Sequence, residues 1–296
     1  MPMDAPQHSL ADPTDPPAPA AALLLVGNSR ARSAWYADGG VHHVQSHPVQ
    51  DAPAIAQALH DRLAENQGSA LLVASVNAPA AREVEHALRR AWSLDDQAPW
   101  PVTLAYAGAD LPVPMPTTVA HPQRLGVDRL LCCLAAYSMA KQACIVIDAG
   151  TAITVDFVDG QGVHHGGAIA PGVGAMLAGL VHAAPALPTL NATQALAMRQ
   201  PQDRPWGEDT QPAMALGVRA AAVGMVHDLI DRFALAYGAY PRVVATGGDA
   251  PALFEHDELV EHVVPDLQLV GLARAYEASL RRDDDDDPRA DRGQPD

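Results

Sequence analysis

The 296-residue chain has few cysteines, few aromatic residues and no cluster of positive charge. Its three cysteines, Cys132, Cys133 and Cys144, form no CxxC pair, which argues against a disulfide framework or a zinc site and suits a reducing compartment. We expect all three to be buried packing residues. No apolar run approaches the roughly 20 residues that cross a bilayer, and the N-terminus lacks a signal-peptide pattern. The sequence therefore predicts a cytoplasmic protein with no membrane partner.

The charge is strongly negative, at −16, and half of it comes from the two ends of the chain. Residues 1–21 contain three Asp and no Lys or Arg, and residues 283–296 contain seven Asp and two Arg. The remaining body has no basic patch, so we do not expect nucleic acid as a partner. Residues 1–21 and 282–296 are predicted to be disordered, because they are rich in proline or acidic residues and poor in core-forming ones.

Between these ends, two halves of the chain open in the same way. Residues 22–140 begin with a short apolar strand, a turn at Gly27 and a hairpin over residues 32–46, followed by alternating helices and strands. Residues 141–281 begin with the strand "CIVID", a turn at Gly150 and two further strands. The pattern predicts an internal duplication of one α/β unit, with the two copies facing each other across a cleft.

Three glycine turns follow predicted strands, in the stretches "GNSR", "DAGT" and "ATGGDA". Glycine lets backbone N–H groups approach an anion closely, and Ser, Thr or Asn side chains add hydrogen bonds. Each turn alone is common hairpin chemistry, but the three together indicate a nucleotide clamp. The adjacent pair His164–His165 does not extend this site to a metal, because neighbouring residues on a strand point to opposite faces.

Seven stretches in this order resemble the motif set of type III pantothenate kinases, a family of the acetate and sugar kinase, Hsp70 and actin superfamily. They are "GNSR" at 27–30, "LGVDR" at 125–129, "DAGTAITVD" at 148–156, "GGAIAPGV" at 166–173, "LP" at 187–188, "GEDTQPAMALGV" at 207–218 and "ATGGDA" at 245–250. The resemblance covers roughly residues 22–280. It implies two similar actin-like (ribonuclease H-like) domains with ATP in the cleft between them. The activity it implies is ATP-dependent phosphorylation of pantothenate to 4'-phosphopantothenate, the first step of coenzyme A biosynthesis.

The same resemblance assigns roles to the acceptor site. Asp128 matches the general base, which takes the proton of the attacking hydroxyl, although Asp in the first turn of a helix is also favoured by the macrodipole. Gly126, Val127 and Arg129 match pantothenate-binding positions together with Asp128, and a surface ion pair is the alternative for Arg129. Thr210 matches a substrate threonine, and it could equally be the N-cap of a helix over residues 211–236.

Nucleotide and cation roles come from the resemblance as well. ATP-contacting positions are matched by Gly27, Asn28, Ser29, Arg30, Gly150 and Thr151. Asp148 matches the site of a monovalent cation, K⁺ or NH₄⁺, with a strand-end turn residue as its alternative. The family also implies Mg²⁺ on the phosphates and a homodimer whose pantothenate site lies at or near the subunit interface.

One position departs from the family pattern. The first phosphate motif usually carries an Asp two residues before its glycine, and here that position is Leu25, which cannot coordinate a hard cation. Three hypotheses remain: an active pantothenate kinase with Mg²⁺ held mainly by ATP and water, a nucleotide-binding but catalytically weak homologue with an accessory or regulatory role, and a kinase for another small hydroxyl compound.

Overall fold

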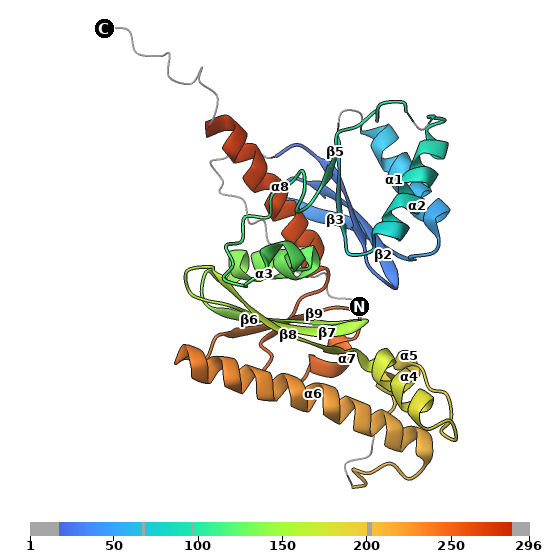
Figure 1. Cartoon of the computed structure of the whole chain (residues 1–296), viewed down its shortest axis with the longest axis vertical. Coiled ribbons are helices and arrows are strands. Elements are labelled where there is room, and N and C mark those ends of the chain that lie inside the picture. The colour runs from blue at the N-terminus through green and yellow to red at the C-terminus, as the bar shows by residue number, and fades with distance from the viewer. Residues whose placement is uncertain (1–17, 67–68, 96, 200–202, 286–296) are drawn as a thin grey trace. The chain divides into compact units, whose positions relative to one another are not determined.

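The computed structural model describes residues 18–66, 69–95, 97–199 and 203–285. It divides into two compact units (Figure 1). The first unit contains the chain up to Pro114, residues Gly126–Leu134 and the chain from Gln268, and the second contains residues Met115–Leu125 and Ala135–Leu267. This division differs from a single boundary between residues 140 and 141, because helix α3 (Val127–Ala140) contributes to both units and helix α8 (Leu267–Asp285) belongs almost entirely to the first.

The first unit is built on a five-stranded mixed sheet in the order β3-β2-β1-β4-β5. Its strands are β1 (Ala21–Val26), β2 (Arg30–Ala37), β3 (Gly40–Pro48), β4 (Ala70–Ser75) and β5 (Leu104–Tyr106). Strands β1, β2 and β3 form an antiparallel meander, whereas β4 lies parallel to β1 and β5 parallel to β4. The predicted hairpin over 32–46 is therefore confirmed, with slightly longer strands than expected.

Helices α1 (Ala52–Glu65) and α2 (Ala78–Ala91) pack on one face of this sheet. The sequence explains where both helices begin. The side chains of Asp51 and Asn77 each accept a hydrogen bond from the backbone N–H three positions later in the chain, and a proline lies in the first turn of each helix. Ile55 and Leu59 of α1 join Leu24 of β1 in a buried apolar cluster. Each fully buried side chain of this kind contributes about 1.5–3 kcal/mol.

The second unit repeats the topology. Its strands are β6 (Cys144–Ala149), β7 (Ala152–Val158), β8 (His164–Pro171), β9 (Arg242–Thr246) and β10 (His262–Val263), in the order β10-β9-β6-β7-β8. Read from β8, this is the same antiparallel meander followed by two parallel strands. Two such sheets with this strand order are the actin-like, ribonuclease H-like arrangement, so the predicted fold class and duplication are confirmed.

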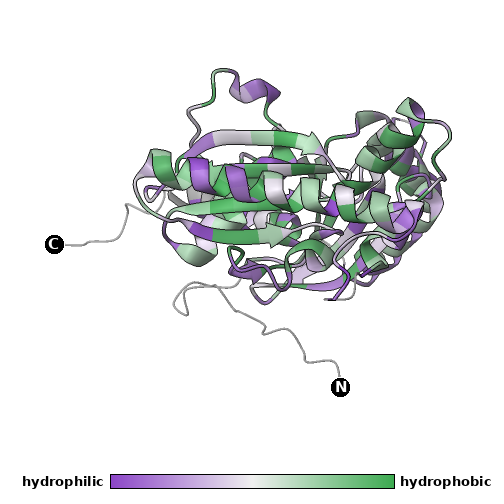
Figure 2. Ribbon diagram, turned by 90° about the horizontal axis from the view of Figure 1, so that it is seen from below, coloured by the Kyte–Doolittle hydropathy of each residue, from purple (hydrophilic) through white to green (hydrophobic). Residues whose placement is uncertain are grey.

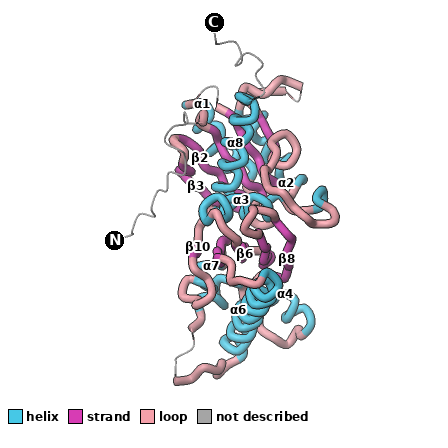
Figure 3. Tube along the Cα trace, turned by 90° about the vertical axis from the view of Figure 1, so that its left-hand side faces the viewer, coloured by secondary structure: helices cyan, strands magenta, loops and turns pink. Residues whose placement is uncertain are grey.

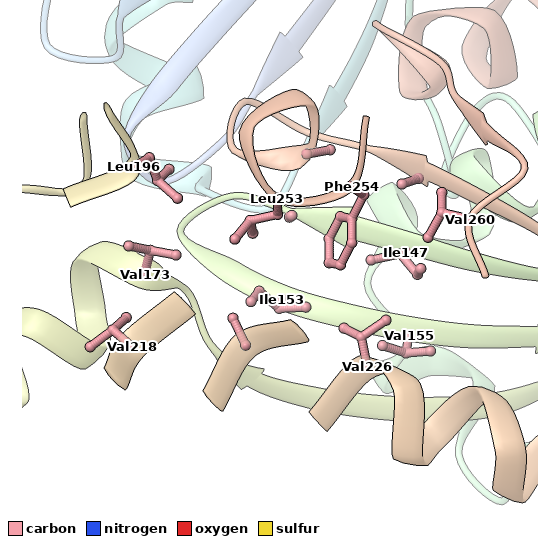
Figure 4. Packing of buried hydrophobic residues seen from close by; sticks show 14 of the residues in the cluster. Ile147, Ile153, Val155, Val173, Leu196, Val218, Val226, Leu253, Phe254 and Val260 are labelled. Carbon is pink, nitrogen blue, oxygen red and sulfur yellow. The ribbon is translucent and has the colours of Figure 1, made fainter. Parts of the chain in front are cut away.

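Helices α4 (Val173–Ala183), α5 (Ala192–Ala197), α6 (Thr210–Tyr237) and α7 (Ala250–Phe254) complete the second unit, and a 3₁₀ turn, η1, spans Pro122–Arg124. Figure 4 shows Val226 of α6 beside Val155 of the sheet and Val218 of α6 near Val173 of α4, all within one buried apolar cluster that also contains Phe254 of α7. In Figure 2 the strands are mostly hydrophobic while the helices alternate in hydropathy, as expected for elements with one buried side.

Helix α6 is long and apolar enough to cross a bilayer by length and mean hydropathy. The expectation that no apolar run approaches that length is therefore wrong for this segment. A stripe of its residues, including Met214, Ala222 and Ile230, is buried in the core of the second unit. Figure 3 shows α6 as one continuous helix beside α4. Core packing accounts for this buried stripe, which makes up about a third of the most apolar part of the helix.

The ends of the described chain are more ordered than predicted. β1 begins at Ala21, inside the segment expected to be disordered, and α8 continues to Asp285, inside the expected acidic tail. Residues 1–17 and 286–296, where the rest of both predictions falls, lie outside the described residues. The three cysteines are buried, as expected. Burial raises the pKa of the Cys144 thiol to about 12.

Candidate active site

The first glycine turn joins β1 to β2 in the first unit. The N–H of Gly27 donates to the carbonyl of Arg30 at 3.0 Å, and Asn28 and Ser29 between them are exposed. The side chain of Asn77, which caps α2, donates to the carbonyl of Gly27 at 3.3 Å. Asn77 was not singled out from the sequence as a site residue. In the sequence, Asn77 stands before Ala-Pro at the start of a helix, a pattern that indicates an N-cap and not a ligand-binding residue.

Leu25 lies in β1, five per cent exposed, directly opposite Arg32 of β2 and Ala74 of β4. It faces away from the side of the sheet on which Leu24 and Val26 pack. Neither β1 nor the turn that follows carries a carboxylate. This turn can offer an anion backbone N–H groups and polar side chains, but no acidic ligand for a metal.

The Gly-x-Asp-Arg motif forms the start of α3. The carboxylate of Asp128 folds back toward the chain, where its Oδ1 accepts the N–H of Arg129 at 2.9 Å. A Cβ at position 126 would overlap that same oxygen, so glycine is required there for this carboxylate position. In the first turn of a helix the macrodipole favours the ionised carboxylate. Val127, Asp128 and Arg129 are all half-buried.

The second and third glycine turns meet at the carboxyl ends of two parallel strands of the second unit. Asp148 of β6 pairs with Thr246 of β9. Gly247 has a φ of 98°, in the left-handed region, and a Cβ there would lie 2.5 Å from Oδ1 of Asp148. The structure thus brings together Asp148, Gly150 and Thr151 with the turn that follows β9, and Thr151 is exposed.

Gly172, between β8 and α4, contacts the same turn. The N–H of Gly172 donates to the carbonyl of Thr151 at 3.1 Å. A Cβ on Gly172 would overlap the carbonyl oxygen of Gly150 and lie 2.7 Å from that of Thr151. The Gly in the "APG" stretch therefore fixes the position of the Gly150–Thr151 turn.

A second carboxylate near this turn was missed from the sequence. Asp249 is the N-cap residue of α7, and its N–H donates to the carbonyl of Ala149 at 2.9 Å. It is half-buried, and this burial raises the pKa of its carboxyl above the ordinary value. The signal was present in "GGDA", where an Asp follows two glycines at a strand end. Asp148 and Asp249 are oxygen donors of the type that hard cations prefer, so a cation fits this half of the site better than the turn after β1.

Thr210 lies elsewhere in the second unit. Asp209, not Thr210, is the N-cap of α6, and its carboxylate accepts the N–H of Thr210 at 2.7 Å. Thr210 is thus not the cap residue; it is exposed and lines a pocket of about 740 Å³. The other lining residues are Met176, Leu180, Leu187, Gly207, Glu208, Asp209, Ala213, Met214, Gly217, Val218 and Ala221. Neither Asp148 nor Thr151 lines this pocket, so the structure does not join Thr210 to the glycine turns within its unit.

Comparison with known proteins gives one family. Residues 23–232 match the family model described as type III pantothenate kinase. A type III pantothenate kinase from Acidiphilium cryptum is 41% identical over 152 residues, which cover 51% of this chain and 54% of the relative. Another from Rhodopirellula baltica is 42% identical over 143 residues, covering 48% of this chain and 50% of the relative. The matched segment thus spans about half the length of these curated relatives.

Among solved structures, a Campylobacter jejuni protein assigned to the Baf family of transcriptional activators has a TM-score of 0.54 and 19% identity. The match covers 88% of this chain and 99% of that one. At this identity the likeness shows the shared fold alone.

Proposed function

We infer the function from one premise: the chain belongs to the type III pantothenate kinase family, as its motifs indicated. We propose that it is a phosphotransferase that transfers the γ-phosphate of ATP to the primary hydroxyl of pantothenate. The products are ADP and 4'-phosphopantothenate, and the reaction is the first step of coenzyme A biosynthesis. The observation that carries this proposal is the carboxylate of Asp128, held over Gly126 at the start of α3.

In the proposed reaction, Asp128 accepts the proton of the pantothenate hydroxyl. The hydroxyl oxygen forms a bond to the γ-phosphorus while the bond from that phosphorus to the β–γ bridging oxygen breaks, and ADP leaves with the electron pair. The first turn of a helix is a favourable place for a carboxylate, which is the form that a general base needs. Gly126, Val127 and Arg129 bind pantothenate beside it, with the guanidinium of Arg129 suited to the carboxylate of the substrate.

The glycine turns are proposed to hold ATP. Gly27, Asn28, Ser29 and Arg30 offer N–H groups and polar side chains from the first unit, and Gly150 with Thr151 offers them from the second. Mg²⁺, when bound with ATP, would supply charge neutralisation on the phosphates. Asp148 is proposed to hold a monovalent cation, K⁺ or NH₄⁺, and its half-buried carboxylate beside Gly247 supports that role.

We propose further that the acceptor site is completed in a homodimer. The Thr210 pocket is lined by apolar side chains of α4 and α6 and includes neither Asp148 nor Thr151. A threonine that contacts pantothenate from such a place is best explained by a site shared between two subunits. The low cysteine content, with all three cysteines buried, supports the cytoplasm as the proposed location. Pantothenate is the proposed partner, with no nucleic acid or membrane.

Leu25 supports one alternative function. The strand before the first glycine turn has no carboxylate, so the protein could bind nucleotide but turn over weakly, in an accessory or regulatory role.

One assay separates these functions: purified protein with Mg-ATP, K⁺ and pantothenate, in which ADP and phosphopantothenate are both measured. Asp128→Asn should lower kcat by about 10²- to 10⁴-fold, the usual contribution of a general base. Asp228→Asn, an exposed change on α6, is the matched control and should leave kcat unchanged. Full turnover by Asp128→Asn would sink the proposed role. ATP binding by calorimetry without turnover of the unaltered protein would favour the alternative, and turnover only with other alcohols would favour a different acceptor.

A further inference from the structure

Two hydrogen-bonded chains, each of Thr, His and Asp, fasten residues 116–119 to the edge strand β8 of the second unit. The backbone starts the attachment: the N–H of His164 donates to the carbonyl of Pro116 at 2.8 Å, and the N–H of Thr118 donates to the carbonyl of His164 at 3.0 Å. Thr117 and His164 form a parallel bridge. Thr117 therefore lies beside His164, and Thr118 lies beside His165.

The two histidine side chains lie on opposite faces of the sheet, at a β-bulge, with His164 beside Asp156 and His165 beside Phe157. Phe157 of β7 pairs with Gly166 and Val158 pairs with His164, which leaves His165 as an additional residue. Gly166 follows with a φ of 99°, a conformation that favours glycine. The side chain of His164 is fully buried and that of His165 is 40% exposed. The prediction that these two histidines cannot jointly chelate a metal agrees with this arrangement.

The buried chain is built from Asp156, His164 and Thr117. Nε2 of His164 lies 2.7 Å from Oδ1 of Asp156, and Nδ1 lies 3.0 Å from the hydroxyl of Thr117. That hydroxyl oxygen also accepts the N–H of Val119 at 3.3 Å. Since a carboxylate only accepts, His164 donates from Nε2, and its Nδ1 is left to accept the Thr117 hydroxyl. Because Asp156 and His164 are buried, this set of hydrogen bonds is part of the core of the second unit.

The exposed chain is built from Asp159, His165 and Thr118. Nε2 of His165 lies 2.7 Å from Oδ2 of Asp159, and Nδ1 lies 3.2 Å from the hydroxyl of Thr118. The other oxygen of Asp159 accepts the N–H groups of Gln161 and Val163, at 2.9 and 3.0 Å. Burial acts to raise the pKa of Asp159, but the hydrogen bonds from His165 and the two amides lower it below its ordinary value. Asp159 is therefore a fixed, ionised anchor for the His165 ring.

The fastened segment leads directly into the proposed acceptor site. Residues 119–125 connect Thr118 to Gly126 and Asp128, and they include the 3₁₀ turn η1. The turn is short and hydrogen-bonded, with the N–H of Arg124 donating to His121 and that of Leu125 donating to Pro122. A link this short transmits a shift at Thr118 to the start of α3 more readily than a long flexible loop would.

We propose that the chain Thr118–His165–Asp159 positions the acceptor motif, with His165 as a positioning residue for pantothenate rather than a catalytic one. The inference rests on the proposed function for its kinetic consequence. The buried chain holds the fold, whereas the exposed chain can be broken without removing a core group. The backbone hydrogen bonds of Thr118 and His164 remain when the Thr118 hydroxyl is lost, but residues 119–125 lose their side-chain anchor, so the start of α3 with Gly126 and Asp128 is held less tightly.

The kinetic test compares Thr118→Val with the conservative Thr118→Ser and with His165→Phe, which keeps a ring beside Phe157. Thr118→Val and His165→Phe should lower kcat/KM for pantothenate by about 10-fold or more, since small misplacements of reacting groups are costly. KM for ATP should stay within about twofold, and Thr118→Ser should restore the unaltered kcat/KM. Thr193→Val, an exposed threonine on α5, is the matched control and should change neither. Two results would overturn the proposal: equal kcat/KM for Thr118→Val and the unaltered protein, or a KM for ATP that rises in parallel with the loss of kcat/KM.

Hydrogen exchange gives a readout that does not depend on activity. Amides of residues 119–126 should exchange faster in Thr118→Val and His165→Phe than in Thr118→Ser or Thr193→Val. If the unaltered protein fails to phosphorylate pantothenate, the proposed function falls, but the exchange pattern still decides whether this chain holds the segment. Unchanged exchange in Thr118→Val contradicts the inference even where turnover of the unaltered protein supports the function.

Discussion

Replacing Gly172 by alanine should damage ATP binding through one methyl group. Gly172 has a φ of −71° and a ψ of 170°, a conformation that alanine adopts without strain, so the added atom is the whole perturbation. That atom would overlap the carbonyl oxygen of Gly150 and lie 2.7 Å from the carbonyl oxygen of Thr151. Both neighbours are backbone atoms, which cannot rotate away as a side chain can.

The size of the effect follows from these contacts. Ordinary contact for a Cβ begins at 3.4 Å, so the carbonyl of Thr151 alone must retreat by about 0.7 Å. Overpacking of this kind costs about 1–3 kcal/mol of folding free energy. Because the retreat moves the Gly150–Thr151 turn, KM for ATP should rise by about 10-fold or more, while KM for pantothenate changes less.

The assay is steady-state kinetics with each substrate varied in turn, beside denaturant unfolding to measure the free energy. Gly179→Ala is the matched control, because Gly179 lies within α4 and a Cβ there meets nothing within 4 Å. That variant should keep both KM values and gain up to about 1 kcal/mol, since alanine is favoured over glycine in a helix. If Gly172→Ala shows the KM for ATP of the unaltered protein, the Gly150–Thr151 turn does not hold the nucleotide and the reasoning fails.

Three further predictions concern single side chains. Leu25→Asp should raise kcat or tighten the Mg²⁺ dependence, at a stability cost of about 1–3 kcal/mol for a carboxyl on a nearly buried strand; no change in either kinetic property would show that the position is no metal site. Asp148→Asn should raise the K⁺ or NH₄⁺ concentration needed for half-maximal rate by about 10-fold or more, and an unaltered cation titration would refute that role. Burial raises the pKa of Cys144 from 9.0 to about 12, so its stabilising effect is complete below pH 9 and is lost as pH rises toward 12. Between pH 9 and 10 unfolding measurements should show a loss of up to about 1.4 kcal/mol that Cys144→Ala removes; an equal slope in both proteins would contradict it.

Much of the fold could be predicted because its local signals agree with its tertiary structure. The strand at 70–76, the helix near 53–66 and the long helix from 210 all lie where the apolar periodicity placed them, within one or two residues. The duplication was visible because each half opens with strand, glycine turn and strand. The course of α8 was not visible: its apolar face says that it is buried, but not that it returns to the first unit.

The site was predictable where backbone geometry forces the residue type. Glycine at 126 and 247 marks close approaches that the structure contains, and Gly247 also has a positive φ. Asn77 and Asp249 were missed because each stands at the start of a helix, where such residues are common without any ligand; only Asn77 caps its helix with its side chain. For Thr210 only the alternative was wrong, and its role in substrate binding stays a prediction. It stood at a plausible cap position, but its neighbour Asp209 caps α6 instead.

The duplication allows the position that carries the acid in one half to be compared with the position that lacks it in the other. Leu25 and Asp148 occupy equivalent places, each the fifth residue of a six-residue strand and two residues before a glycine. Asp148 has Thr154 and Thr246 opposite it, small polar neighbours that leave a carboxylate room to bind a cation. Leu25 instead has Arg32 opposite it, on the same face of an antiparallel pair. A carboxylate at position 25 would meet that guanidinium as well as any metal, so in Leu25→Asp the added charge is divided between an ion pair and Mg²⁺. Combining Leu25→Asp with Arg32→Gln should therefore strengthen the Mg²⁺ dependence beyond that of Leu25→Asp alone, and equal dependence in the two proteins would exclude Arg32 as the competitor.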